Sequence, residues 1–122
     1  MTEFSFTKSS RLLSSQDFQR VFAQADLKAS HQHLLILARY NQLDYPRLGL
    51  VIAKKNIAKA VQRNRVKRHI RETFRLKQHK LPGIDAIVLA RRQLDTLDDT
   101  ELNNLLHRQW ERLLKKSQPT QR

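Results

Sequence analysis

Basic side chains are concentrated on one predicted helix, residues 59–78. With about 100° between successive residues of a helix, Val66, Ile70 and Phe74 form a narrow apolar stripe. The remaining side carries polar and basic residues: Asn64, Lys67, Arg68, Arg71 and Arg75 lie opposite the stripe, Arg65 flanks them, and Arg63 lies nearer the apolar edge. A guanidinium can donate two parallel hydrogen bonds to one phosphate, so this helix could bind the backbone of a nucleic acid.

A merely solvated helix is the alternative interpretation of this charge, and it predicts a different pattern. Solvated helices gain stability from opposite charges at i and i+4. Here Arg63, Lys67, Arg71 and Arg75 repeat like charge at that spacing, which costs ~0.2–0.5 kcal/mol per pair. Glu72 is the only acid between residues 54 and 80, a window with eleven Lys or Arg. Repulsion repeated along one face favours an anionic partner.

The composition limits the rest of the molecule. A chain of 122 residues with 39% hydrophobic residues fits one domain with one core. Lys and Arg number 24 against 11 Asp and Glu, a net charge of +13 that attracts polyanions. The absence of Cys excludes disulfides, thiolate nucleophiles and cysteine zinc sites. No apolar run approaches the roughly 20 residues of a membrane span, and residues 1–13 do not resemble a secretory signal, so the cytoplasm is the expected location.

The elements that must position the basic helix alternate in type. A first helix begins after a capping Ser14 or Ser15, and residues 27–30 interrupt the pattern. A strand at 33–40, a turn at 41–46 and an antiparallel partner at 47–53 precede the basic helix; residues 81–83 end it, and a strand at 84–90 and a helix at about 98–116 follow. The order helix, strand, strand, helix, strand, helix predicts an α+β fold, a small mainly antiparallel sheet packed with helices in an α-β sandwich. We expect one RNA-binding domain over residues 1–122, with residues 1–13 irregular and residues 117–122 a frayed tail.

Other partners and chemistries fit the sequence less well. An anionic membrane surface would require a broader apolar face, and a DNA-binding helix-turn-helix would require a second helix nearby; neither a membrane nor DNA is expected. The only acidic cluster, Asp95, Asp98, Asp99 and Glu101, lies where a helix N-terminus prefers carboxylates. His31 and His33 have no third ligand for a metal. His69 is expected on the RNA side or in solvent.

Residues 54–75 resemble the signature of the protein subunit of bacterial ribonuclease P. The matching positions are the triplet Arg63-Asn64-Arg65, then Lys67-Arg68, Arg71-Glu72 and Phe74-Arg75. Further matches are residues 48–55, Arg11-Leu12, Asp17-Phe18, Val21-Phe22 and residues 85–91. The resemblance therefore covers nearly the whole chain in the right order.

The resemblance implies an RNA partner and a function in tRNA processing. Proteins of this family pair with a large catalytic RNA, and together they remove the 5′ leader of precursor tRNA by hydrolysing one phosphodiester. The RNA and its Mg²⁺ ions carry the chemistry, so we expect no catalytic residue and no cofactor bound by this protein alone. The family fold has a left-handed β-α-β crossover, whereas the general rule is right-handed.

The resemblance also assigns residues to two surfaces. The RNA-binding set is Lys54, Lys55, Arg63, Asn64, Arg65, Lys67, Arg68, Arg71 and Arg75. The leader groove, between the first helix and the sheet, is assigned Phe18, Phe22, Ile36 and Arg11, with Ile36 at a position that is often Tyr. Two Phe four residues apart are also common in a core. A plain RNA-binding or ribosome-associated protein and an autonomous nuclease are the alternative functions.

Overall fold

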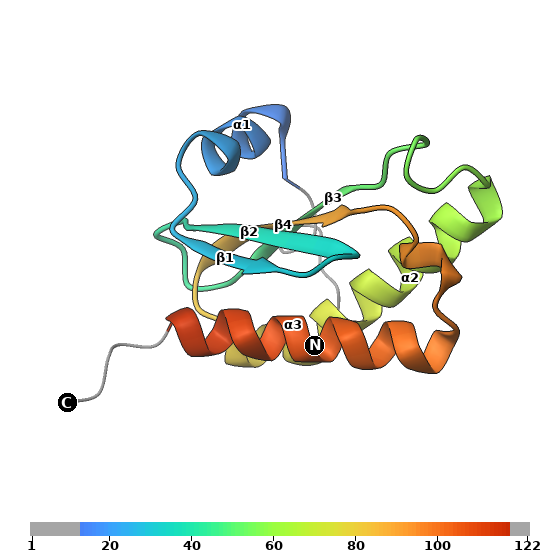
Figure 1. Ribbon diagram of the computed structural model, residues 1–122. Coiled ribbons are helices and arrows are strands. Elements are labelled where there is room, and N and C mark those ends of the chain that lie inside the picture. Colours follow the sequence, from blue (N-terminus) through green and yellow to red (C-terminus); the bar gives the residue numbers. More distant parts are fainter. Residues whose placement is uncertain (1–12, 118–122) are drawn as a thin grey trace.

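The computed structural model describes residues 13–117, which form three α-helices, two short 3-10 helices and four strands (Figure 1). In chain order they are α1 (Ser15–Ala23), β1 (Leu27–Ser30), β2 (Leu34–Tyr40), β3 (Arg47–Val51), α2 (Ala60–Lys77), η2 (Gln78–Lys80), β4 (Ile84–Ala90), η3 (Leu94–Thr96) and α3 (Asp99–Ser117). Ser117, which we assigned to the tail, is the last residue of α3; the other residues of the predicted tail and residues 1–12 lie outside the described part.

One sheet holds the four strands in the order β1-β2-β4-β3. β1 pairs with β2 and β2 with β4 in antiparallel fashion, whereas β3 runs parallel to β4. Helix α1 lies over one face of the sheet, and α2 and α3 lie side by side under the other (Figure 1). The predicted α+β sandwich with a mainly antiparallel sheet is therefore confirmed.

Two details of the strand prediction were wrong. Residues 27–30 do not break the pattern but form β1, an edge strand. The strands at 34–40 and 47–51 do not pair, because β4 lies between them. β4 takes the central place since six of its seven residues are buried, as expected of a strand covered on both faces. β3 and β4 are joined through α2, and the handedness of this crossover stays a prediction.

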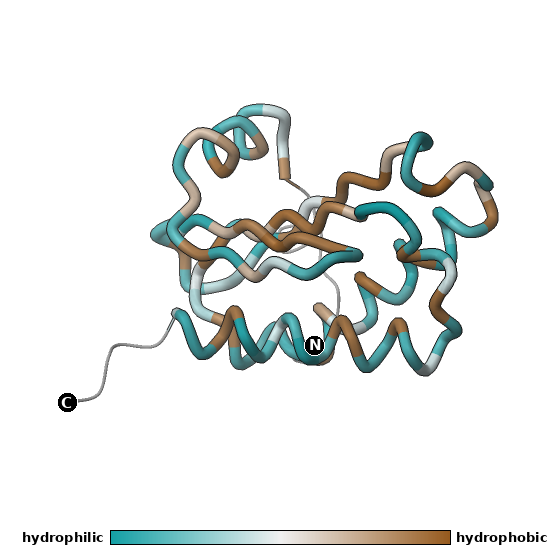
Figure 2. Tube along the Cα trace, in the orientation of Figure 1, coloured by the Kyte–Doolittle hydropathy of each residue, from teal (hydrophilic) through white to brown (hydrophobic). Residues whose placement is uncertain are grey.

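The main core lies between the sheet and the pair α2 and α3. Val66, Ile70 and Phe74 have no exposed surface, which confirms the predicted apolar stripe of α2. The Phe74 and Trp110 rings lie 5.6 Å apart, and Trp110 Nε1 donates to Thr73 Oγ1 at 3.0 Å. Figure 2 shows mostly hydrophobic residues along the strands, whereas hydrophobic and hydrophilic residues alternate along the helices. This packing fixes which side of α2 faces outward.

Candidate nucleic-acid interface

The start of α2 has a positive electrostatic potential that favours an anion. Its N-cap residue, Lys59, makes no side-chain capping bond, and the first turn holds no acidic residue. The first backbone N–H groups of a helix carry partial positive charge, which proteins often balance with an acidic side chain. Here basic residues stand in that place, so the field of the helix end and the side-chain charges have the same sign.

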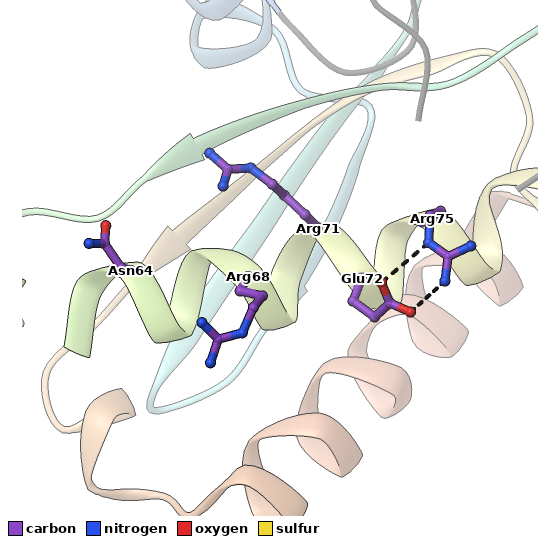
Figure 3. Close-up of a pocket in the computed structure, with 5 residues that line it drawn as sticks. All are labelled: Asn64, Arg68, Arg71, Glu72 and Arg75. Carbon is purple, nitrogen blue, oxygen red and sulfur yellow. Dashed lines mark hydrogen bonds and ion pairs between the residues drawn. The ribbon is translucent and has the colours of Figure 1, made fainter. Parts of the chain in front are cut away.

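Three arginines, one asparagine and one glutamate surround a hollow of about 380 Å³ on the outer side of α2 (Figure 3). They are Asn64, Arg68, Arg71, Glu72 and Arg75. Arg75 donates to Glu72 at 2.5 and 3.2 Å, and this hydrogen-bonded pair lowers the pKa of Glu72. The negative charge of Glu72 thus compensates the positive charge of Arg75, whereas Arg68 and Arg71 form no ion pair with it.

Arg68 and Arg71 are the uncompensated cations of this hollow. Both are exposed, and neither forms a hydrogen bond or an ion pair within residues 13–117. Their guanidinium groups extend away from α2 in different directions (Figure 3). Each therefore has its donors available for a separate phosphate.

Arg65 has a structural role that the sequence did not reveal. Its side chain is 18% exposed and turns toward the segment before α3. It donates to Leu97 O at 2.8 Å, to Asp95 O at 3.1 Å and to Asp99 Oδ1 at 2.6 Å. It also donates to Gln62 at 2.9 Å. Arg65 thus fastens α2 to the start of α3, and its contact with RNA stays a prediction.

Two neighbours of Arg65 are also engaged inside the protein. Arg63 Nη1 donates to Ile57 O at 3.1 Å and to Ala58 O at 2.7 Å, which fastens the loop that leads into α2. His69, expected on the RNA side or in solvent, is half-buried instead, with Nε2 3.1 Å from Asp99 Oδ1. That prediction was wrong because His69 lies on the side of α2 that meets the first residue of α3.

The lysines predicted at the entrance are placed by the loop between β3 and α2. Asn56 Nδ2 donates to Ala90 O at 3.0 Å, and Ile57 is fully buried, so the loop is fixed against the end of β4. Lys54 and Lys55 precede these anchors and are exposed, while Lys67 on α2 is half-buried. None of these three lysines has an ion-pair partner in the part of the chain that the structure describes.

Of the three predicted leader-groove residues that the structure describes, one is exposed on the α1 face. Phe22 is 50% exposed. Phe18 is half-buried against β3: a Cβ on Gly49 would lie 2.6 Å from Phe18 Cζ, so this contact requires glycine. The two rings are 6.4 Å apart. Arg11 lies outside the described residues.

The assignment of Ile36 to the groove was wrong. Ile36 has no exposed surface and belongs to the core under the sheet, with Val88 as its register partner. Successive strand residues point to opposite faces, so its neighbours Leu35 and Leu37, both half-buried, face α1 instead.

A buried ion network that the sequence analysis missed holds α1 on the sheet. Arg47 donates twice to Asp85 at 2.8 Å and lies 3.3 Å from Asp17 of α1. Asp17 also completes the capping box with Ser14. Burial tends to raise the pKa of Asp17, but the hydrogen bonds from Ser14 and the charges of Arg47 and Arg20 outweigh it and lower the pKa. An acidic residue inside the apolar run of β4 was the available signal.

The carboxylates do not form a metal site. Asp98 and Glu101 make a reciprocal capping pair at the start of α3, at 2.8 and 2.9 Å, as predicted. Asp99 is engaged with Arg65 and His69, whose hydrogen bonds lower its pKa. Within residues 13–117 no three His, Cys, Asp or Glu side chains could share a metal ion. No helix among these residues is long and apolar enough to cross a membrane.

Comparison with known proteins agrees with this geometry. The family model described as ribonuclease P matches residues 6–114. The ribonuclease P protein component of Chromohalobacter salexigens is 51% identical over 115 residues, which cover 94% of this chain and 90% of that protein. That of Saccharophagus degradans is 53% identical, with 94% and 85% covered.

Solved structures with the same fold belong to the same class of protein. The RNase P protein from Thermotoga maritima superposes with a TM-score of 0.73 at 31% identity and covers 90% of this chain and 99% of its own. That from Staphylococcus aureus gives a TM-score of 0.72 at 28% identity, with 88% and 94% covered.

Proposed function

This chain belongs to the ribonuclease P protein family, and from that membership and its own geometry we propose that it binds the catalytic RNA through α2 and the 5′ leader of precursor tRNA on the α1 face. It is the protein component of a ribonucleoprotein endoribonuclease, and its partner is the ribonuclease P RNA. Precursor tRNA as the bound substrate and the cytoplasm as the location are parts of the proposal.

The observation that carries the proposal is the pair Arg68 and Arg71. Both lie on the outer side of a helix whose inner stripe is fully buried, and neither has a partner within residues 13–117. Exposed like charges on one face repel each other, and RNA phosphates remove that repulsion while releasing condensed counterions. A solvated surface without a ligand offers no such compensation.

The α1 face supports the leader part of the proposal. Phe22 offers an exposed ring, and unpaired bases stack on aromatic side chains. Phe18 is placed behind it by its contact with Gly49, so it supports the surface more than it provides it. The ion network of Arg47 with Asp17 and Asp85 keeps α1 at a fixed position over the sheet. This fixed position supports the proposal that the α1 face is in place before RNA binds.

The hydrolysis itself is assigned to the RNA. Mg²⁺ serves phosphodiester hydrolysis by activating water and by stabilising developing charge. Within residues 13–117 no three His, Cys, Asp or Glu side chains could share such an ion, and Asp85, Asp98 and Asp99 are engaged in caps and ion pairs. We therefore propose that the RNA holds the Mg²⁺ that the holoenzyme requires. The protein's contribution is electrostatic: it lies between two polyanions and weakens their repulsion.

The decisive experiment is precursor-tRNA cleavage by a bacterial ribonuclease P RNA at low Mg²⁺, with and without the protein, beside the protein alone. Stimulation by the pair and no cleavage by the protein alone are expected. RNA binding without stimulation would favour a plain RNA-binding protein, and cleavage by the protein alone would indicate an autonomous nuclease. Added Mg²⁺ or salt should partly replace the protein, because both screen the same repulsion.

A pair of variants locates the effect. Arg71→Gln removes one exposed charge from the α2 hollow, and Lys80→Gln removes one exposed charge from η2, outside that hollow. Loss of one phosphate contact should reduce the slope of log affinity against log salt by about 0.7–0.9. That reduction is expected for Arg71→Gln alone. Equal slopes for the two variants would remove the α2 hollow from the interface.

A further inference from the structure

A second cluster of basic groups surrounds the turn between β1 and β2. Arg91, directly after β4, donates through Nη1 to His31 O at 2.7 Å and to Ser30 Oγ at 3.2 Å. Arg112, on α3, donates through Nη1 to Ser30 O at 3.1 Å. Two parts of the chain that are distant in sequence thus bring cations to the turn formed by residues 31–33.

The turn and α3 enclose a hollow of about 330 Å³ beside these arginines. It is lined by His31, Gln32, His33, Leu97, Glu101, Asn104, Leu105 and Arg108. It shares no residue with the hollow on α2, and β1, the strand before the turn, is the sheet edge opposite β3. Arg108 is exposed and has no hydrogen bond or ion pair within the described part of the chain.

The charge at this turn is not balanced. Three guanidinium groups face it, and the one carboxylate that lines the hollow, Glu101, accepts a hydrogen bond from the backbone of Asp98. Burial lowers the pKa of His31, and the positive charges of its neighbours, including Arg108, Arg112 and Arg91, lower it further. The three arginines are therefore close enough to His31 for their charges to act on it.

The two histidines contribute hydrogen-bonding groups to the turn. The backbone N–H of His33 donates to His31 Nδ1 at 3.1 Å, so the proton of the neutral His31 ring is on Nε2. His33 Nδ1 lies 3.1 Å from Arg92 O and must donate, because a carbonyl only accepts. His31 Nε2 remains as a donor for a ligand at the turn.

Protection of the sheet edge explains part of this cluster. β1 is an edge strand, and Arg112 and Lys116 donate to its outward carbonyls, those of Ser30 and Lys28. Basic side chains commonly shield such edges from pairing with another chain. Edge protection accounts for one nitrogen of Arg112. It does not account for Arg108, nor for the other guanidinium nitrogens of Arg91 and Arg112.

We propose that Arg91, Arg108, Arg112 and His31 form a second phosphate-binding site, separate from α2, that binds the phosphodiester backbone of RNA. Arg108 and His31 line the hollow, and Arg91 and Arg112 bind the turn that forms one of its walls. Guanidinium groups and an imidazole N–H are donors that phosphate oxygens accept. It does not require that the α2 face bind the catalytic RNA. With both sites occupied, the protein contacts RNA phosphates at two hollows that share no lining residue.

The test compares Arg108→Gln with Lys80→Gln, which each remove one exposed positive charge. Affinity is measured over a salt series for two ligands, the ribonuclease P RNA with the free protein and precursor tRNA with the assembled holoenzyme. The slope for Arg108→Gln should fall by about 0.7–0.9 with one of the two RNAs, so that the loss of affinity between about 50 and about 200 mM salt shrinks about threefold. The RNA that shows the change supplies the phosphate.

Lys80→Gln should keep the wild-type slope in both series. If Arg108→Gln matches Lys80→Gln with both RNAs, the proposal is overturned, whatever the result for Arg71→Gln at α2. An independent reading uses the full chain and inorganic phosphate: the His31 ring resonances should shift with phosphate in Lys80→Gln and shift much less in Arg108→Gln. Equal shifts in the two variants would also reject the site.

Discussion

Replacement of Arg65 by Ala should lower the free energy of unfolding, because this side chain joins α2 to the segment before α3. The side chain is 18% exposed, and its Nη2 donates to the backbone carbonyls of Asp95 and Leu97 at 3.1 and 2.8 Å. A hydrogen bond of this kind contributes about 1 kcal/mol net, and a carbonyl left without a donor costs at least as much. The ion pair with Asp99 adds little to the free energy of unfolding, because that carboxylate is exposed.

The expected loss is therefore about 2 kcal/mol of the free energy of unfolding. For a domain of this size it corresponds to a fall in Tm of roughly 6–12 °C. Arg68→Ala on the same helix is the matched control: Arg68 is exposed and has no partner within residues 13–117, so the change should stay within about 0.5 kcal/mol. Arg65→Lys keeps the charge but cannot reach several acceptors at once, so its Tm should fall between the two.

Thermal unfolding by circular dichroism measures the Tm values, and RNA affinity over a salt series measures the contacts. We expect Arg65→Ala to lower Tm, and Arg68→Ala to lower the salt slope at unchanged Tm. If Arg65→Ala has the Tm of Arg68→Ala and loses one phosphate contact, then Arg65 faces RNA in solution and its role as an anchor of α3 is refuted.

Three further results are expected. Phe74→Ala should destabilise by about 3–5 kcal/mol in denaturant unfolding, because the ring is fully buried against Trp110; unchanged stability would show that α2 faces the other way. Phe22→Ala should weaken binding of precursor tRNA relative to mature tRNA without lowering Tm, since half of the ring is exposed; an equal loss for both tRNAs would place the leader elsewhere. The lowered pKa of Asp17 means that its stabilisation is present above its ordinary value of about 4 and is lost as pH falls through the folded value. Asp17→Asn should therefore be less stable at neutral pH and should lose less stability than the wild type on acidification, and parallel acid curves would contradict this.

The helices were predictable from the sequence because their evidence is local. The capping box of α1 joins Ser14 to Asp17, three residues away, and the capping pair of α3 joins Asp98 to Glu101. The apolar stripe of α2 repeats every four residues. Each of these signals lies within one or two helical turns, so no knowledge of the tertiary fold was needed.

The strands and the anchors depended on distant parts of the chain. Residues 34–38 are all apolar, so alternation could not show which face Ile36 occupies, and the sheet order places β4 between strands that are neighbours in sequence. Arg65 and Asp99 are 34 residues apart, and the helical pattern, which places Arg65 at the flank of the basic side, does not show that it reaches this partner. Long-range partners, not residue type, decide which arginine holds the fold.

The net charge of +13 does not say which cations are available to RNA. Arg47 and Arg65 are committed to carboxylates and carbonyls inside the domain, and Arg112 gives one donor to the edge of the sheet. Arg68 and Arg71 are free of such partners in the described part of the chain and face outward. Because the salt slope counts phosphates contacted and not net charge, it is set by outward-facing cations such as these and not by the value of +13.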